Sequence, residues 1–138
     1  MGITIRVAEP ADRESLVALW EAAGLTRPWN DPRADFDMAL GRDRSTILLA
    51  CENKAVSGSV MVGFDGHRGW VYYLAVAPEK RGFGIGRMLM LEAEQWLKAI
   101  GCPKIQLMVR GDNNVARGFY AALGYDLQDV VTLGRRLD

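Results

Sequence analysis

Three glycines at every second position separate an apolar, strand-like run from a periodic, helix-like segment. The stretch is Arg81-Gly82-Phe83-Gly84-Ile85-Gly86, and the apolar run before it covers residues 71–76. Glycine lets the main chain approach a ligand closely and adopt dihedral angles that other residues resist. The free N–H groups at the start of a helix, together with its dipole, favour phosphate at that end. The spacing therefore predicts a pyrophosphate site.

Two better-known glycine loops do not fit this stretch. A dinucleotide-binding loop needs G-x-G-x-x-G and an acidic residue after the next strand, whereas the spacing here is G-x-G-x-G and the strand-like run 104–109 is followed by Arg110. A P-loop needs G-x-x-x-x-G-K-[ST], which does not occur. A glycine-rich turn that only packs a helix closely onto a strand stays open as an alternative.

The length of 138 residues predicts one domain, spanning 1–138. Its balanced charges predict no strong electric field around the protein. Lys plus Arg and Asp plus Glu number 17 each, so we expect neither a nucleic-acid nor a membrane partner. No run reaches the roughly 18 apolar residues of a membrane span. Residues 1–6 alternate like a strand and lack the apolar core of a signal peptide, which predicts a cytoplasmic protein. The chain is expected to be a monomer or a homodimer.

The cysteine and histidine content argues against a metal site. Cys51 and Cys102 are isolated, without CxxC spacing, which predicts reduced and buried small side chains. His67 is the only histidine, so a histidine-rich metal site is excluded. We therefore expect no bound metal.

Hydrophobic periodicity predicts the element order β-α-α-β-β-β-α-β-α-β, a single mixed α/β layer structure. The clearest pattern is a helix from Ile85, in which positions 85, 88, 89, 93, 96, 97 and 100 are apolar. The expected strands are 3–7, 46–52, 56–64, 70–76, 104–109 and one or two within 125–137; the other expected helices are 10–23, 35–40 and 113–123.

Two motifs in sequence order resemble those of the GNAT-type N-acetyltransferases, over essentially the whole chain. The family places [QR]-x-x-G-x-[GA] after its fourth strand, which Arg81–Gly86 fits. The family pattern N-x-x-A-x-x-[FL]-Y-x-x-x-G-[FY] is filled in register by Asn113, Ala116, Phe119, Tyr120, Gly124 and Tyr125. The stretches 25–32, 65–69 and 101–105 are similar to the bacterial YpeA-like branch. The resemblance implies the GNAT fold, a central mixed sheet flanked by helices, with splayed fourth and fifth strands.

By this resemblance the ligand of the glycine loop is acetyl-CoA, the acyl donor. Backbone N–H groups of 83–86 would hold the pyrophosphate and Arg81 would add a charge-assisted contact, while the pantetheine arm would pair with the main chain near Leu74 and Val76. Asn113 would help hold the pantetheine, and its other interpretation is an N-cap. The implied cofactor residues are Leu74, Ala75, Val76, Arg81, Gly82, Phe83, Gly84, Ile85, Gly86, Arg87, Asn113, Ala116 and Phe119.

Tyr120 occupies the position of the family's general acid. A tyrosine, with a reference pKa of about 10, is protonated at neutral pH and can donate a proton to the departing CoA thiolate. Without the motif, the same residue would be interpreted as a core tyrosine on an apolar helix face. The oxyanion of the tetrahedral intermediate could be held by a backbone N–H within 74–76.

Acceptor specificity is expected in the loop after the first helix and on the fourth strand. The predicted acceptor-binding residues are Arg27, Trp29, Asn30, Asp31, Tyr72 and Tyr73. The alternative for the loop is a proline-braced surface segment that Trp29 anchors to the core. Some relatives use a glutamate on strand four or five as general base, and these strands carry no carboxylate here. A water chain, Asp31, Glu21 or His67 are the candidates, and the base stays unassigned.

The sequence thus predicts an N-acetyltransferase that moves acetyl from acetyl-CoA to a primary amine by direct attack in a ternary complex. The acceptor could be a small molecule, an amino acid, or a peptide or protein amine. A catalytically silent acyl-CoA-binding or regulatory module is the alternative. A nucleotide-binding domain is disfavoured by the glycine spacing.

Overall fold

The computed structural model describes residues 2–138 and divides into two compact units, Met1–Met108 and Val109–Asp138. The elements of the first unit are β1 (Ile3–Val7), η1 (Pro10–Asp12), α1 (Arg13–Ala22), α2 (Pro32–Ala39), β2 (Ser45–Glu52), β3 (Ala55–Phe64), β4 (Gly69–Val76), η2 (Pro78–Lys80), α3 (Ile85–Ala99) and β5 (Ile105–Gln106). The second unit contains α4 (Asn114–Ala122). A segment as short as the second unit cannot bury a core of its own, so a single domain stays our prediction.

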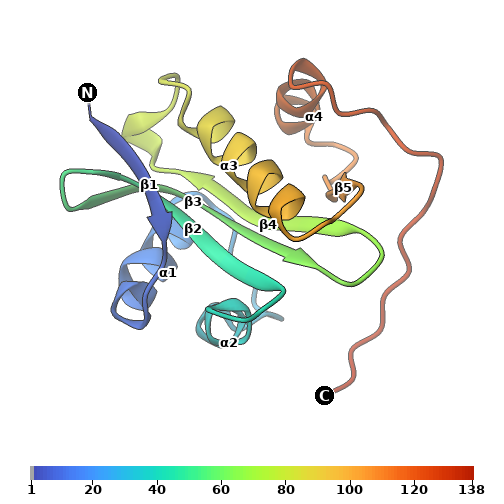
Figure 1. Cartoon of the computed structure of the whole chain (residues 1–138), viewed down its shortest axis with the longest axis horizontal. Coiled ribbons are helices and arrows are strands. Elements are labelled where there is room, and N and C mark those ends of the chain that lie inside the picture. The colour runs from blue at the N-terminus through green and yellow to red at the C-terminus, as the bar shows by residue number, and fades with distance from the viewer. Residues whose placement is uncertain (1) are drawn as a thin grey trace. The chain divides into compact units, whose positions relative to one another are not determined.

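The five strands form one mixed sheet in the order β1-β2-β3-β4-β5. The pairs from β1 to β4 are antiparallel, and β4 pairs with β5 in parallel. Helices α1 and α2 cover one face of the sheet and α3 covers the other (Figure 1). The predicted mixed α/β fold, a sheet flanked by helices, is confirmed.

Each sheet face buries the apolar stripe of the helices that cover it. On the α1–α2 face, Leu16, Trp20 and Phe36 pack against Ile47 and Leu49 with at most 1% of any of these residues exposed. Helix α3 buries Ile85, Leu89, Ala93 and Leu97, one residue in every four, as well as Met90. The 3.6-residue period of a helix brings these positions to one side, as the sequence pattern predicted.

Two glycines in the sheet let α3 lie close to it. A Cβ atom built on Gly58 would stand 2.9 Å from the Ala75 carbonyl oxygen and 2.9 Å from a Leu89 methyl carbon. A Cβ atom on Gly69 would stand 2.6 Å from a methyl carbon of Leu97. Close packing of this helix on the sheet therefore depends on glycines in β3 and β4.

The predicted strand 104–109 is wrong in extent, and the prediction of one or two strands within 125–137 is wrong altogether. Only Ile105–Gln106 of the expected strand 104–109 is strand, and no strand forms within 125–137. A strand needs a neighbour to accept its backbone hydrogen bonds, and the second unit contains no other strand within the residues described. The apolar side chains of this segment are exposed instead, as shown by Leu127, Val130, Val131 and Leu133. Because no strand forms in this segment, there is no exposed strand edge here that could support the predicted homodimer.

Both cysteines are free thiols, as predicted, but only one is fully buried. Cys51 lies in the core with 4% exposure, whereas Cys102 is partly exposed, and its Sγ donates to the Lys104 carbonyl at 3.4 Å.

Replacing Gly58 by alanine should destabilise the protein by about 1–3 kcal/mol, the usual cost of overpacking a core. The added methyl would meet a backbone oxygen, which cannot rotate away. Gly63→Ala on the same strand is the matched control, because its nearest neighbours would lie at 3.4 Å. Urea denaturation followed by circular dichroism measures both. Equal stabilities of the two variants would contradict the close-approach argument.

Candidate functional site

Within the residues described, most of β4 has no strand partner on the side of β5. The two strands pair only through Gly69 with Ile105 and Trp70 with Gln106, so the predicted separation of these strands begins after Trp70. Farther along, the Ala77 N–H donates to the Ser57 carbonyl on β3 at 2.8 Å. Successive N–H groups of a strand point to opposite sides, so those of Val76 and Leu74 point away from β3, to the free edge.

A β-bulge interrupts β4 beside this free edge. Tyr72 pairs with Met61 and Ala75 pairs with Ser59, so two residues of β4 stand opposite Val60 alone. The first of them, Tyr73, has a φ of +52°, which for a non-glycine residue costs about 1–3 kcal/mol. Bulges of this kind re-aim side chains and end pairing. Here the bulge carries one of the predicted acceptor-binding residues.

The bulge turns two consecutive tyrosines to the α1–α2 face. Met61 packs against the α1–α2 core, and Tyr72 is its cross-strand partner on that face. The Tyr73 ring stacks on Trp20 with centroids 3.9 Å apart and planes 15° apart. In a regular strand these neighbours would point to opposite faces. Tyr72 is 45% exposed and open to a ligand, whereas Tyr73 is part-buried.

Three residues hold Tyr73 in place. Its hydroxyl donates to Asp35 Oδ2 at 2.6 Å. Trp20 Nε1 donates to Ser59 Oγ at 2.9 Å, and Ser59 Oγ donates to the Tyr73 carbonyl at 2.9 Å. Burial first, and then the Asp35 carboxylate, raise the pKa of Tyr73, so its hydroxyl stays a proton donor. We call Trp20, Asp35, Ser59 and Tyr73 the bulge cluster.

The glycine loop adopts the left-handed backbone that glycine permits. Gly82 has a φ of +85° and Gly84 a φ of +79°. A Cβ atom on either would meet nothing within 4 Å. At these two positions the interpretation as a packing turn is therefore wrong, because glycine is required by the backbone conformation and not by lack of space.

The N-terminus of α3 is left without a side-chain cap. Its N-cap is Gly84, and the first turn contains no acidic residue. By contrast, the Asp31 side chain caps α2 and the Asn113 side chain caps α4. The first intrahelical bond joins the Met88 N–H to the Gly84 carbonyl at 3.1 Å, which leaves the N–H groups of 85–87 without an acceptor inside the helix. These donors suit an anion.

The side chains around the glycine loop also suit an anionic ligand. Arg81 and Arg87 are exposed at the two ends of the loop, before and inside the first turn of α3. Phe83 is 58% exposed between the two left-handed glycines. The predicted cofactor residues 74–76 and 81–87 thus lie along one continuous segment, from the free edge of β4 to the start of α3.

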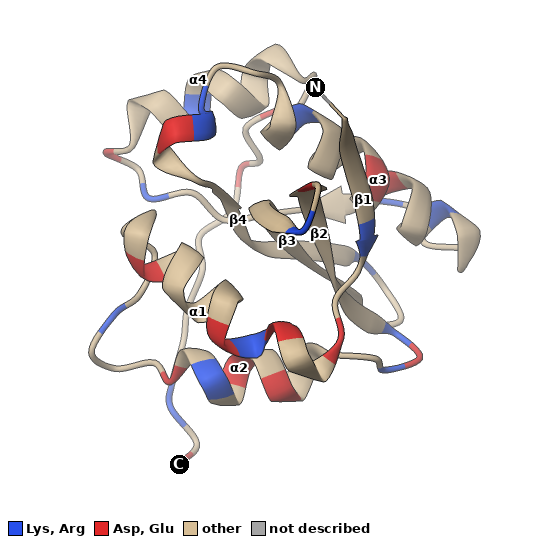
Figure 2. Cartoon of the chain, turned by 90° about the vertical axis from the view of Figure 1, so that its left-hand side faces the viewer, with Lys and Arg blue, Asp and Glu red and all other residues tan. Residues whose placement is uncertain are grey.

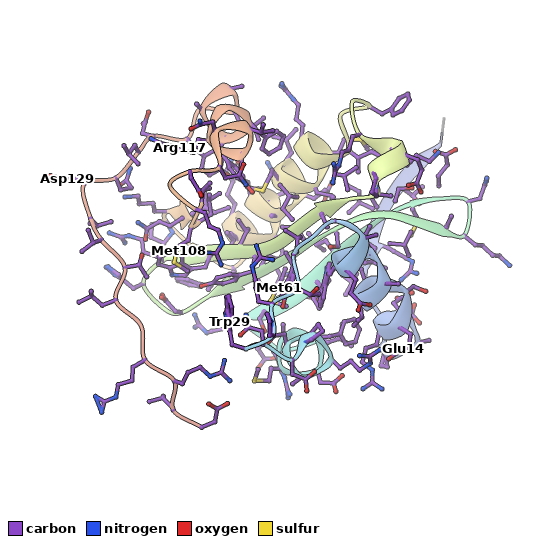
Figure 3. All side chains as sticks on the ribbon, turned by 180° about the vertical axis from the view of Figure 1, so that it is seen from behind. Glu14, Trp29, Met61, Met108, Arg117 and Asp129 are labelled. Carbon is purple, nitrogen blue, oxygen red and sulfur yellow. The ribbon has the colours of Figure 1, made fainter. Side chains whose placement is uncertain are left out.

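The loop after α1 has a structural framework of its own. Arg27 Nη1 donates to the carbonyls of Gly24 and Thr26, both at 2.9 Å. The Asp31 carboxylate accepts from the backbone N–H groups of Arg33 and Ala34. Figure 3 labels Trp29 in the loop after α1. Because 58% of this residue is exposed, the interpretation in which it anchors the loop to the core is wrong.

The α1–α2 layer carries acidic and basic side chains side by side (Figure 2). The Glu14 carboxylate accepts from Arg33 Nη2 at 2.7 Å and pairs with Arg13 Nε at 3.3 Å. The bond with Arg33 is the main cause that lowers the pKa of Glu14. Of the candidate bases, Glu21 and Asp31 are exposed on this layer, and His67 is exposed in the turn before β4.

The second unit contains the remaining motif residues. The Asn113 side chain accepts from the Ala116 N–H at 3.1 Å, so its N-cap role is confirmed. The Tyr120 ring lies edge-on to Phe119 and to Tyr125, with centroids 5.0 and 5.8 Å away. Burial raises the pKa of Tyr120 to about 12. No residue of α4 is fully buried, so Tyr120 is not a fully buried core residue.

Sequence reasoning did not identify the bulge cluster. Trp20 and Asp35 were expected only as parts of helices, and Ser59 only as part of a strand. The sequence around Tyr73 contains no residue that would predict its positive φ. None of the motifs includes the positions of the bulge cluster. The one available signal is the pair Tyr72-Tyr73, two consecutive aromatic residues within the apolar run 71–76.

The residues described contain neither a cluster of metal ligands nor a membrane-spanning helix. Nowhere in 2–138 do three His, Cys, Asp or Glu side chains gather closely enough to hold a metal ion. No helix in that range is long and apolar enough to cross a membrane.

Comparisons with known proteins agree with this geometry. A curated acetyltransferase from Pectobacterium atrosepticum is 48% identical over 133 residues, which cover 96% of this chain and 94% of that protein. The aminoglycoside N-acetyltransferase AAC(6')-Iy, solved with CoA, is 18% identical with a TM-score of 0.84, over 99% of this chain and 96% of that one. A predicted acetyltransferase from Clostridium acetobutylicum, solved with acetyl-CoA, is 18% identical with a TM-score of 0.79, over 96% of each chain.

The family model described as "Acetyltransferase (GNAT) family" matches residues 14–125, which include both motifs. The chain belongs to the GNAT family of acetyltransferases.

Proposed function

We propose that this protein transfers the acetyl group of acetyl-CoA to a primary amine. The observation that carries the proposal is the uncapped N-terminus of α3 behind two left-handed glycines, continuous with a strand edge that presents free N–H groups. The first feature suits a pyrophosphate and the second suits the amides of a pantetheine arm. The CoA and acetyl-CoA held by two structural relatives support the same ligand.

In the proposed reaction the neutral amine attacks the thioester carbonyl carbon within a ternary complex. A C–N bond forms, and the carbonyl electron pair moves to oxygen, where a backbone N–H within 74–76 stabilises the oxyanion. Collapse of this intermediate breaks the C–S bond. Tyr120 donates its phenolic proton to the departing thiolate and regains one from solvent, while the amine nitrogen releases its surplus proton. A phenol with a pKa of about 12 is fully protonated for this role at neutral pH.

The proposed acceptor site combines the loop after α1 with the exposed face of β4. Trp29 and Tyr72 supply exposed aromatic surface. The Arg27 and Asp31 side chains each bond to backbone groups and so stabilise the conformation of the loop. Their charges would also be available to bind charged groups of the acceptor. One structural relative is an aminoglycoside acetyltransferase solved with sisomicin, and AAC(6')-Iy was solved with the bisubstrate analogue CoA-S-monomethyl-acetylneamine. We infer a small-molecule or peptide amine as the acceptor.

Three finer assignments accompany this proposal. We infer membership of the YpeA-like branch from the stretches 25–32, 65–69 and 101–105. A cytoplasmic location is supported by the two free thiols. The protein acts as a monomer or a homodimer.

A turnover assay tests the proposal against a silent acyl-CoA-binding module. The protein is incubated with acetyl-CoA and a panel of amino acids, polyamines, aminoglycosides and short peptides, and free thiol is measured. We expect amine-dependent thiol release with at least one class of amine. Binding of acetyl-CoA without release above the amine-free rate, for every amine, would favour the silent module.

Replacing Gly84 by glutamate should weaken acetyl-CoA binding far more than replacing it by glutamine. Both side chains strain the left-handed backbone equally, but only glutamate places a negative charge beside the pyrophosphate. We expect Gly84→Glu to raise Kd by about tenfold or more relative to Gly84→Gln. Isothermal titration with acetyl-CoA measures both values. Equal Kd values in the two variants would place the pyrophosphate elsewhere.

Replacing Tyr120 by phenylalanine should lower kcat by about 100-fold or more, the usual contribution of a general acid. The Kd for acetyl-CoA should stay nearly unchanged, because the ring is kept. Tyr125→Phe is the control, since it removes a hydroxyl from the neighbouring ring and phenylalanine also fits the motif there. If Tyr120→Phe retains the wild-type kcat, Tyr120 is not the acid.

The pH–rate profile should lack a descending limb near pH 10. Because burial raises the pKa of Tyr120 to about 12, its protonated form persists well above the ordinary tyrosine value. The rate should instead rise with pH as a lysine-like amine, with a pKa near 10.4, becomes the free base. Measuring kcat from neutral to alkaline pH at saturating acetyl-CoA checks this. A fall in kcat centred near pH 10 would contradict the assigned environment of Tyr120.

A further inference from the structure

The bulge in β4 is held by side chains from the two helices on one face of the sheet and from the neighbouring strand. Trp20 comes from α1, Asp35 from α2 and Ser59 from β3, and all three contact Tyr73 or bond to a neighbour that does. Trp20 and Ser59 are completely buried. A stacked pair and three hydrogen bonds are each worth about 0.5–1.5 kcal/mol, which together offset the cost of the positive φ. The strain at Tyr73 is thus maintained by its surroundings.

A strained residue that its surroundings hold in place often has a functional role. Here that role concerns the direction of the backbone N–H groups that follow Tyr73. Leu74 follows Tyr73, and its N–H points to the free edge of β4. The bulge inserts one extra residue between Tyr72 and Ala75 and so shifts by one position which N–H groups point to that edge. Without the bulge, the direction of every N–H from 74 to 76 would be reversed. The conformation of Tyr73 therefore determines which N–H groups face the edge.

Asp35 is the only member of the bulge cluster that bonds to the Tyr73 side chain from a helix covering the sheet. Its Oδ2 accepts from the hydroxyl at 2.6 Å, a distance typical of a strong bond to a carboxylate. The bond ties the far end of the ring to α2, while Trp20 stacks on its face. Asp35 thus restrains the ring against sliding along Trp20, which stacking alone does not prevent.

We propose that Asp35 is a positioning residue for acetyl transfer, which acts through the Tyr73 hydroxyl to hold the bulge in β4 and so aims the edge-facing N–H groups of Leu74 and Val76 at the thioester. The inference rests on the proposed function and adds a residue to it. Asp35 touches neither the acyl group nor the amine in this role, and its charge is not consumed. An acceptor oxygen at this position is what the role requires.

Kinetics of four variants test the proposal. Asp35→Ala and Tyr73→Phe should each lower kcat by about tenfold to 100-fold, because misplaced donors stabilise the oxyanion less well, while KM for acetyl-CoA stays within about twofold. The double variant should match the single ones, since both remove the same bond. Asp35→Asn keeps an acceptor oxygen and should retain most of kcat.

Asp37→Ala is the matched control on the same helix. It breaks the pair between Asp37 Oδ2 and Arg13 Nη1, 3.1 Å long, and so loosens α2 from α1 without contact with Tyr73. Its kcat should stay at the wild-type value. An unchanged kcat in Asp35→Ala, additive losses in the double variant, or an Asp35→Asn loss as large as that of Asp35→Ala would each overturn the positioning role.

A readout that needs no acceptor separates this proposal from the proposed function. The infrared carbonyl band of bound, carbonyl-labelled acetyl-CoA should lie at lower frequency than in water, because aimed N–H donors polarise the bond. The shift should shrink in Asp35→Ala and Tyr73→Phe and persist in Asp37→Ala. Binding with the same band in all variants would overturn the role of Asp35 alone. Failure of the wild-type protein to bind acetyl-CoA would remove the proposed function and this inference with it.

Discussion

The interruption of β4 is the constraint on which the rest of the site depends. A strand inside a sheet would have all its N–H groups satisfied by neighbours and could bind no ligand through them. Here β5 stops pairing after Trp70, and the bulge at Tyr73 redirects the backbone that follows. The same chain then turns through Gly82 and Gly84 into α3, whose first N–H groups also lack partners. One segment thus joins these two sets of backbone donors.

Such a segment is costly unless the remaining structure supports it. The buried contacts of Trp20 and Ser59 hold the bulge from within the core. On the other face, Gly58 and Gly69 bring α3 close enough to fix where its N-terminus lies. The exposed arginines near that terminus add charge without needing burial. Packing on both faces of the sheet therefore supports the ligand-binding segment.

The parts of this arrangement that the sequence predicted are those with a fixed residue pattern. The apolar period of α3 and the glycines before it define a helix start that needs no tertiary information. The bulge cluster could not be predicted in the same way, because Asp35 and Tyr73 are 38 positions apart and meet only in the folded chain. The strand predicted in 125–137 failed for a related reason. Apolar residues favour a strand, but a partner must be present to pair with it.

The most direct test of the central claim is the unfolding midpoint of the wild-type protein with millimolar acetyl-CoA, CoA, ATP or NAD. A ligand at a hundred times its Kd stabilises the folded state by about 2.7 kcal/mol, enough to raise the midpoint by several degrees. We predict such a rise with acetyl-CoA and CoA and none with ATP or NAD. No rise with either CoA ligand, or an equal rise with ATP and NAD, would contradict the assignment of the glycine loop and the β4 edge to CoA.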